Sequence, residues 1–269
     1  MKITPDSIKV VFFDIDYTLY IKNEARIPAS IIKEVLPRLK AKGIIPAIAT
    51  GRNVGGFPKA LLPYLNEEGF QLLVTINGQD NLYRDQQISA YGLSTERITQ
   101  AVEKLQRLGI KYAFVSRESI AVSADDAIVK EATTPITADY LIDPDFYLKN
   151  NVVQMLAYYS EEQREAVEAA GVLGNDLKAV RWHENAVDIF LKQNSKARGI
   201  EDTLAYLGIQ PEQAMAFGDG FNDLEMFETV GFSVAMGNGE EELKAIADFV
   251  TKDIREDGIL YALETLGII

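Results

Sequence analysis

An almost unbroken run of apolar residues, from Ile8 to Ile15, ends in acidic side chains near the amino end of the chain. Such a run is typical of a parallel β-strand that is buried on both faces. The segment from Ala29 to Lys42 then carries apolar residues at helical spacing, and Gly43 is placed to end that helix. A strand followed by a helix in this way predicts a doubly wound α/β layer.

The same alternation is found at both ends of the chain. We expect strands at Ile44 to Ala49 and Leu72 to Ile76, with a helix near Phe57 to Leu65 between them. From about Asn194 the alternation returns, and the expected elements there are a helix at Lys196 to Leu207, a strand at Gln213 to Phe217, a helix at Asn222 to Val230, a strand at Phe232 to Ala235 and a helix at Glu240 to Ala247.

The middle of the chain has a different pattern, of short half-buried strands separated by amphipathic helices. The expected strands are Leu82 to Leu93, Tyr112 to Ser123 and Val152 to Tyr159, and the expected helices are Thr95 to Leu108 and Glu161 to Ala170. Ser160 and Gln163 fit a capping box for the second helix. We therefore predict a Rossmann-like α/β core of residues 1–78 and 189–269, interrupted by an α+β domain of residues 79–188.

Composition excludes several kinds of chemistry. The chain has no cysteine, which rules out disulfides, thiolate nucleophiles and zinc–sulfur sites. Its one histidine, His183, cannot supply a multi-histidine metal site. The net charge of -13 argues against nucleic acid as a partner, because phosphate backbones are bound through basic patches. Carboxylates and lysines remain as the ionised groups for catalysis.

Hydropathy predicts no membrane segment. The first residues, Met1 to Asp6, lack the apolar region of a signal peptide, and no later run approaches the roughly 20 apolar residues that a bilayer requires. We therefore expect a cytoplasmic protein. The sequence does not indicate its oligomeric state.

Two carboxylates follow the first strand, in the sequence Asp14-Ile15-Asp16-Tyr17-Thr18. In an open α/β sheet, ligands bind beyond the carboxyl ends of the strands, so these acids lie where chemistry is usually done. Two carboxylates at this spacing can face one site in different environments. One could attack or bind a metal while the other exchanges a proton.

Two further clusters are suited to an anion. Thr50-Gly51-Arg52 ends another apolar strand, where a hydroxyl and a glycine amide can donate hydrogen bonds to a phosphate oxygen. Lys196 stands at the start of a predicted helix, where the ammonium group and the helix amino terminus both favour negative charge.

The last cluster, Gly218-Asp219-Gly220-Phe221-Asn222-Asp223, follows the strand that ends at Phe217. Two acids and an asparagine between glycines suit the hard oxygen ligation that Mg²⁺ prefers. Asn222 could also cap the helix that follows it.

Together these clusters resemble the four motifs of the haloacid dehalogenase superfamily, in order and with suitable spacing. Ile76-Asn77-Gly78, Val234-Ala235-Met236-Gly237-Asn238 and Asp257-Gly258 further resemble its Cof-like sugar-phosphatase branch. The long stretch between Thr50 and Lys196 has room for a cap domain, which matches that branch. Two positions depart from it, because many members have glycine at the position of Tyr17 and alanine at that of Gln79.

The resemblance implies a phosphatase in which Asp14 is the nucleophile and Asp16 the general acid and base. It implies that Asp14, Asp16, Asp219 and Asp223 form the Mg²⁺ site. We predict catalytic roles for Asp14, Asp16, Thr50 and Lys196, and substrate binding by Ile15, Thr50, Gly51, Arg52, Lys196 and Asn222. The substrate would be a small phosphorylated metabolite, with a cap over residues 79–188 that contacts the leaving group.

Three alternatives remain at this point. A phosphoacceptor signalling domain uses similar residues, but it is about half this length and has no cap. A phosphomutase shares the first chemical step and transfers the phosphoryl group to another hydroxyl. A non-catalytic protein that binds a phosphorylated metabolite would use the same scaffold without turnover.

Overall fold

The computed structural model describes residues 4–269 and divides into two compact units. The first unit comprises Met1–Gly51, Phe57–Ser89 and Ser195–Ile269, and the second comprises Arg52–Gly56 and Ala90–Asn194. The chain therefore builds part of the first unit, passes into the second and then returns, as the change of sequence pattern predicts.

The first unit is built on an eight-stranded sheet in the order β14-β13-β12-β1-β2-β3-β4-β5. Neighbouring strands are parallel from β14 to β3, and β4 is antiparallel to β3. The strands are β1 (Val10–Phe13), β2 (Ile45–Ala49), β3 (Leu72–Thr75), β4 (Asp80–Tyr83), β5 (Gln86–Ala90), β12 (Ala214–Gly218), β13 (Phe232–Ala235) and β14 (Phe249–Val250).

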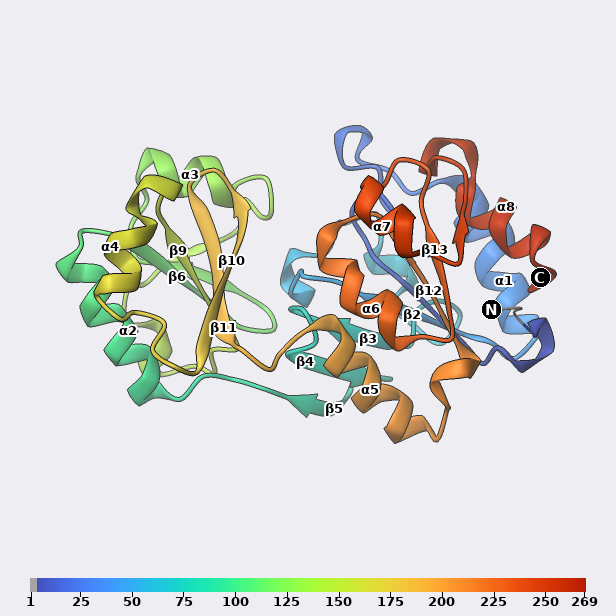
Figure 1. Cartoon of the computed structure of the whole chain (residues 1–269), viewed down its shortest axis with the longest axis horizontal. Helices are drawn as coiled ribbons and strands as arrows, with labels where there is room; N and C mark the ends of the chain where they lie inside the picture. Colours follow the sequence, from blue (N-terminus) through green and yellow to red (C-terminus); the bar gives the residue numbers. More distant parts are fainter. Residues whose placement is uncertain (1–3) are drawn as a thin grey trace. The chain divides into compact units, whose positions relative to one another are not determined.

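Helices cover both faces of this sheet (Figure 1), which confirms the predicted doubly wound layer. On one face α5 (Lys196–Leu207), α6 (Leu224–Thr229) and α7 (Glu241–Ile246) pack on buried residues of the central strands. The other face carries α1 (Leu36–Ala41) and α8 (Gly258–Thr265). There Phe13 stacks on Phe217 with ring centroids 5.2 Å apart.

Two expectations for the first unit are wrong. The segment Phe57 to Leu65 forms no α-helix and contains only the short 3₁₀ turn Leu62–Tyr64, because Pro58 and Pro63 lack the N–H groups that a helix needs. The expected single strand from Leu82 to Leu93 is a hairpin, β4 and β5. It reverses at Arg84 and Asp85, both of which have positive φ, as a tight hairpin turn requires.

The second unit contains a six-stranded sheet in the order β10-β11-β9-β6-β7-β8, antiparallel except between β7 and β8. Helices α2 and α4 bury apolar residues against it. The capping box of Ser160 and Gln163 is present. The elements are α2 (Thr95–Arg107), β6 (Lys111–Val115), β7 (Ile120–Val122), α3 (Ala127–Thr133), β8 (Leu141–Ile142), β9 (Gln154–Tyr158), α4 (Arg164–Ala169), β10 (Leu177–His183) and β11 (Ala186–Leu191).

The division between the units differs in detail from the predicted boundaries. Residues 79–89 belong to the first unit because β4 and β5 extend its sheet, whereas residues 189–194 belong to the second unit because β11 continues to Leu191. The short segment Arg52–Gly56 also belongs to the second unit, although Thr50 and Gly51 belong to the first.

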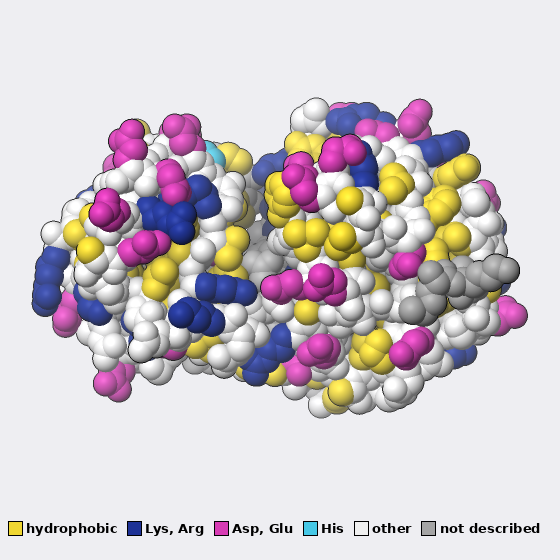
Figure 2. Space-filling model, viewed as in Figure 1, with side chains coloured by type: hydrophobic (Ala, Val, Ile, Leu, Met, Phe, Trp, Pro, Cys, Tyr) yellow, Lys and Arg dark blue, Asp and Glu magenta, His cyan; other side chains and the backbone are white. Residues whose placement is uncertain are grey.

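Within residues 4–269, no helix has the length and apolar character needed to span a bilayer. Acidic and basic side chains are interspersed on the face shown in Figure 2, without a continuous basic stripe.

Helix α5 lies unusually close to the sheet at Gly199. A Cβ added there would lie 2.6 Å from the Gly78 Cα atom and 2.6 Å from the Val74 side chain. Real Cβ atoms do not approach other atoms so closely, so this contact requires glycine. It also fixes the position of the first turn of α5, which carries Lys196.

We therefore expect Gly199→Ala to lower the free energy of unfolding by about 1–3 kcal/mol, the usual cost of overpacking. The gain in helix propensity offsets part of this cost. Urea unfolding monitored by circular dichroism measures the change. The control is Ala205→Ser on the exposed side of the same helix, which should change stability by less than about 0.5 kcal/mol. Equal stability of both variants would show that α5 can move away from the sheet.

Candidate active site

The polar residues predicted to act together lie at one edge of the first unit's sheet. Asp14 follows β1, Thr50 follows β2 and Asp219 follows β12, and these three strands are parallel neighbours in the order β12-β1-β2. The Asp14 N–H donates to the Phe217 carbonyl oxygen at 3.0 Å, which continues the pairing of β1 with β12 up to this residue. The site therefore lies at the carboxyl ends of the strands, where open α/β sheets bind ligands.

The ammonium group of Lys196 bonds to two acids of the site, Asp14 and Asp223. Its Nζ atom donates to Asp14 Oδ1 and to Asp223 Oδ1, each at 2.6 Å. The side chains of Lys196 and Asp223 are fully buried, and that of Asp14 is 10% exposed. Because an unpaired buried charge is strongly unfavourable, each of these three groups needs the others. Ser195 caps α5 by accepting a hydrogen bond from the Arg198 N–H, and this cap fixes where Lys196 begins the helix.

Asp223 is held on both of its oxygens. While Oδ1 accepts from Lys196, Oδ2 accepts from the backbone N–H groups of Asp219 and Gly220, each at 3.0 Å. The prediction that Asn222 caps the next helix is wrong, because α6 begins at Leu224 and its N-cap residue is Asp223. Asn222 lies in the preceding 3₁₀ turn and is exposed. The capping preference of asparagine could not reveal this extra turn.

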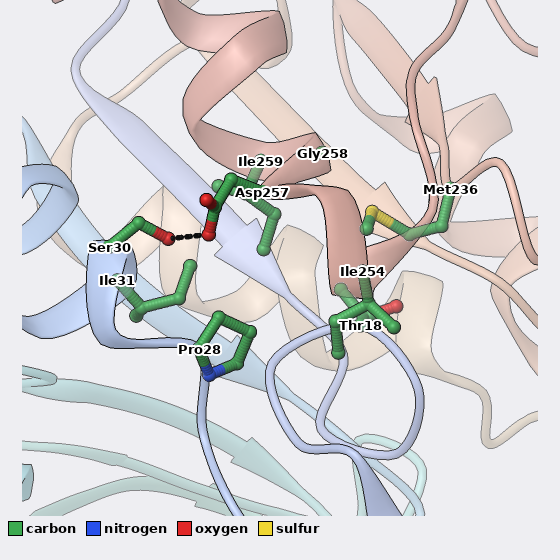
Figure 3. Close-up of a pocket in the computed structure, with 9 residues that line it drawn as sticks. All are labelled: Thr18, Pro28, Ser30, Ile31, Met236, Ile254, Asp257, Gly258 and Ile259. Carbon is green, nitrogen blue, oxygen red and sulfur yellow. Dashed lines mark hydrogen bonds between the residues drawn. The ribbon is translucent and has the colours of Figure 1, made fainter.

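Asp219 is oriented by a residue for which the sequence predicted no role. The Thr18 Oγ1 atom donates to Asp219 Oδ1 at 2.8 Å. Thr18 is fully buried and lines a shallow pocket with Met236 and Ile254 (Figure 3). Its position in the motif Asp14-x-Asp16-x-Thr18 was the available signal, since a buried threonine beside acids requires a hydrogen-bond acceptor.

Burial and like charge alter the protonation of these acids. Burial, followed by the charge of Asp223, raises the pKa of Asp14 to about 7, although Lys196 opposes the change. Burial and the charge of Asp14 likewise raise the pKa of Asp219 to about 8. Burial alone would lower the pKa of Lys196, but the charges of Asp14 and Asp223 raise it above its ordinary value. Lys196 is therefore a fixed cation.

The donor set fits a divalent cation. Oxygen atoms of Asp14, Asp219 and Asp223 lie within 4.8 Å of one another, and carboxylate oxygens are the ligands that Mg²⁺ prefers. When all three acids are ionised, the charge of Lys196, which bonds to Asp14 and Asp223, offsets only one of theirs, so negative charge remains for a cation to compensate. Since both oxygens of Asp223 are already hydrogen-bonded, Asp14 and Asp219 are better placed as direct ligands.

The loop after β1 carries the other predicted residues of the first motif. Asp16 is half-buried, and its charge contributes to the raised pKa of Asp14, so the two carboxylates are near neighbours. Ile15 is fully buried, and its carbonyl oxygen accepts from the N–H groups of Leu19 and Tyr20. Because it is buried, the side chain of Ile15 contributes to the packing of this loop.

Tyr17 has a backbone conformation that favours glycine. Its φ angle is 57°, in the left-handed region that favours glycine. The Asn238 side chain donates to the Tyr17 carbonyl oxygen at 2.9 Å and supports this conformation, while the Tyr17 side chain is 37% exposed. The aromatic ring is thus exposed on the loop that follows β1.

The second motif is divided between the two units. Thr50 is buried, donates its N–H to Val74 and accepts at its carbonyl oxygen from the Asn77 N–H. Gly51 follows it in the first unit. Arg52 belongs to the second unit, where its Nη1 atom donates to the carbonyl oxygens of Gly56 and Ile136. The structure therefore does not group Arg52 with the acidic cluster.

The remaining histidine and tryptophan belong to β10 of the second unit. His183 is half-buried, and its Nδ1 atom accepts from the Asn185 N–H within the turn to β11. The neighbouring Trp182 is also half-buried. Neither residue contributes to the acidic cluster at the carboxyl edge of the first unit's sheet.

The pKa changes predict how stability depends on pH without metal. The folded protein keeps protons on Asp14 and Asp219 up to about pH 7 and 8, whereas an ordinary aspartate loses its proton near pH ~3.9. Because the folded state binds more protons in this interval, these groups make the protein less stable as the pH rises through it. We expect the Tm in chelator to fall between about pH 6 and pH 8.

Differential scanning calorimetry of the native chain and of Asp219→Asn checks this expectation. The variant should lose less stability over the same pH range, because one of the two titrating groups is gone. Mg²⁺ should raise the Tm of the native chain at the upper pH, and raise that of the variant less. A native Tm that does not depend on Mg²⁺ would contradict the assignment of these acids as a cation site.

Comparison with known proteins shows the family of this chain. The family profile of haloacid dehalogenase-like hydrolases matches residues 11–263. The Bacillus subtilis protein YkrA, which carries the name of a phosphatase, is 36% identical over 263 residues, covering 97% of this chain and 98% of that protein. A Streptococcus pyogenes protein, named as a bifunctional phosphatase and peptidyl-prolyl cis-trans isomerase, is 36% identical over all of this chain, which spans 56% of its length.

A solved structure shows the same fold. The sugar phosphatase BT4131, described as a member of haloacid dehalogenase subclass IIB, superimposes with a TM-score of 0.83 and 30% identity, covering 97% of this chain and 100% of that one. The resemblance found in the four motifs is thus confirmed over nearly the whole sequence. The chain belongs to the haloacid dehalogenase-like hydrolases.

Proposed function

We propose that this protein is a Mg²⁺-dependent phosphatase that hydrolyses a small phosphomonoester through a phosphorylated Asp14. The observation that carries the proposal is the grouping of Asp14, Asp219 and Asp223 around buried Lys196 at the carboxyl edge of the sheet. The phosphatase names of relatives and the sugar phosphatase BT4131 support the same class of reaction.

In the first step, an oxygen of Asp14 attacks phosphorus and the bond from phosphorus to the ester oxygen breaks. Lys196 holds Oδ1 of Asp14, so Oδ2 is the attacking atom. The positive charge of Lys196 favours the ionised form that is needed for attack. Asp16 gives its proton to the leaving oxygen, which departs as an alcohol.

In the second step, water attacks the phosphorus of the aspartyl phosphate, and the bond from phosphorus to Asp14 breaks. Asp16 takes the proton from that water, so each group returns to its starting state. Inorganic phosphate is the second product. Splitting the hydrolysis into two displacements on one carboxylate makes each step easier than direct hydrolysis.

The cation would be held by Asp14, Asp219 and the carbonyl oxygen of Asp16. Its charge would offset the repulsion between the anionic nucleophile and the anionic phosphate. Asp223 keeps Lys196 and the Asp219 loop in place through its hydrogen bonds. The Thr50 hydroxyl, the Gly51 amide and Asn222 would bind phosphoryl oxygens with Lys196. The second unit would act as a cap that contacts the leaving group.

The test is phosphate release from a panel of sugar phosphates and other small phosphomonoesters, with and without Mg²⁺. We expect Mg²⁺-dependent turnover by the native chain and a loss of at least about 1000-fold in Asp14→Asn, because the amide cannot attack phosphorus. The control is Asp6→Asn, which removes an exposed acid outside the site. Full activity of Asp14→Asn would remove Asp14 as the nucleophile.

Product analysis on the same panel separates hydrolysis from phosphoryl transfer. Free phosphate should equal the substrate consumed. Formation of an isomeric phosphate ester in place of free phosphate would identify a phosphomutase. Binding without turnover across a broad panel would identify a binding protein.

A further inference from the structure

The turn from β3 into β4 has an unusual backbone. Three consecutive residues have positive φ, with 51° at Ile76, 51° at Asn77 and 79° at Gly78. Only glycine adopts this region freely, and other residues there are strained. A branched residue such as isoleucine is held in this region only when the surrounding structure requires it.

The turn lies between the two segments that carry Thr50 and Lys196. On one side, the Asn77 N–H donates to the Thr50 carbonyl oxygen at 3.0 Å. On the other side, a Cβ added to Gly78 would lie 2.2 Å from the Ser195 carbonyl oxygen and 2.9 Å from the Gly199 nitrogen. The backbone of the turn thus touches both the Thr50 loop and the first turn of α5.

The Asn77 side chain is directed toward Gly51. A Cβ added to Gly51 would lie 3.2 Å from Asn77 Oδ1 and 3.4 Å from its Nδ2 atom. The Oδ1 atom is buried and accepts no hydrogen bond from the described part of the chain. Since a buried acceptor without a partner is destabilising, this placement is unfavourable for the protein alone.

Local structure does not explain the carboxamide. Asparagine is common in left-handed turns because its side chain can bond to nearby backbone, yet Oδ1 of Asn77 makes no such bond within residues 4–269. Glycine would satisfy the backbone at this position with less strain, as it does at residue 78. The carboxamide therefore has a hydrogen-bonding position that no group within residues 4–269 fills.

We propose that Asn77 is a further binding residue of this site, whose carboxamide contacts the phosphate group of the substrate held at Thr50 and Gly51. The inference rests on the proposed function, because it takes the ligand at this loop to be a phosphate ester. As placed, Oδ1 can only accept a hydrogen bond, and a 180° rotation of the carboxamide, which exchanges its oxygen and nitrogen atoms, directs the N–H group to this position instead. Its N–H group can donate to a phosphoryl oxygen without adding charge.

Inorganic phosphate, the product of the proposed reaction, is a suitable probe because binding can be measured without turnover. Isothermal titration calorimetry in Mg²⁺ buffer would compare the native chain with Asn77→Gly, which removes the carboxamide and keeps a residue that adopts positive φ freely. We expect the Kd for phosphate to rise about tenfold, the effect of losing one hydrogen bond to a charged group. Asn77→Asp should weaken binding further, since a carboxylate repels phosphate.

Gln79→Ala is the matched control. The Gln79 Nε2 atom donates to the Ile76 carbonyl oxygen at 2.8 Å, so this variant alters the support of the turn without removing the carboxamide of Asn77. It should lower the Tm and leave the Kd for phosphate unchanged. Equal phosphate affinity in the native chain and Asn77→Gly would overturn the role of Asn77. Absence of phosphate binding by the native chain would instead overturn the proposed function.

Discussion

The site depends on the hydrogen bonds that the buried ammonium group of Lys196 makes. This group bonds to Asp14 at the end of β1 and to Asp223 after β12, and so connects three segments that are far apart in the sequence. Burying one cation with two carboxylates is costly unless every partner is present and hydrogen-bonded. The two amide donors to Asp223 and the cap at Ser195 complete that set. The remaining negative charge makes the site suitable for a divalent cation.

Much of the first unit could be predicted because its signals are local. The apolar runs that form β1, β2, β3, β12 and β13 are short and lie between residues that end strands, and helix α5 was placed at its observed bounds. The polar motifs follow directly from those strands, so their meeting at one edge was also predictable. The burial of these polar residues and the distances between them could not be predicted, because both depend on which strands become neighbours.

The errors arise where tertiary structure overrides local pattern. Apolar residues from Phe57 to Leu65 resemble a helix in spacing, but Pro58 and Pro63 lie in a segment that forms only short turns. The reversal at Arg84 and Asp85 uses positive φ at two residues without a glycine, so no strong local signal marks this turn. The hydrogen bond from Thr18 to Asp219, and the Oδ1 atom of Asn77 that has no partner within residues 4–269, depend on which segments meet in the fold.

The phosphorylation of Asp14 can be tested by stopping the reaction with acid within milliseconds and examining the protein by mass spectrometry. With a substrate identified by phosphate release, we expect a single added phosphoryl group on the peptide that contains Asp14, and none in Asp14→Asn. A native chain that turns over rapidly while every such peptide stays unmodified, or a phosphoryl group on another residue, would contradict it.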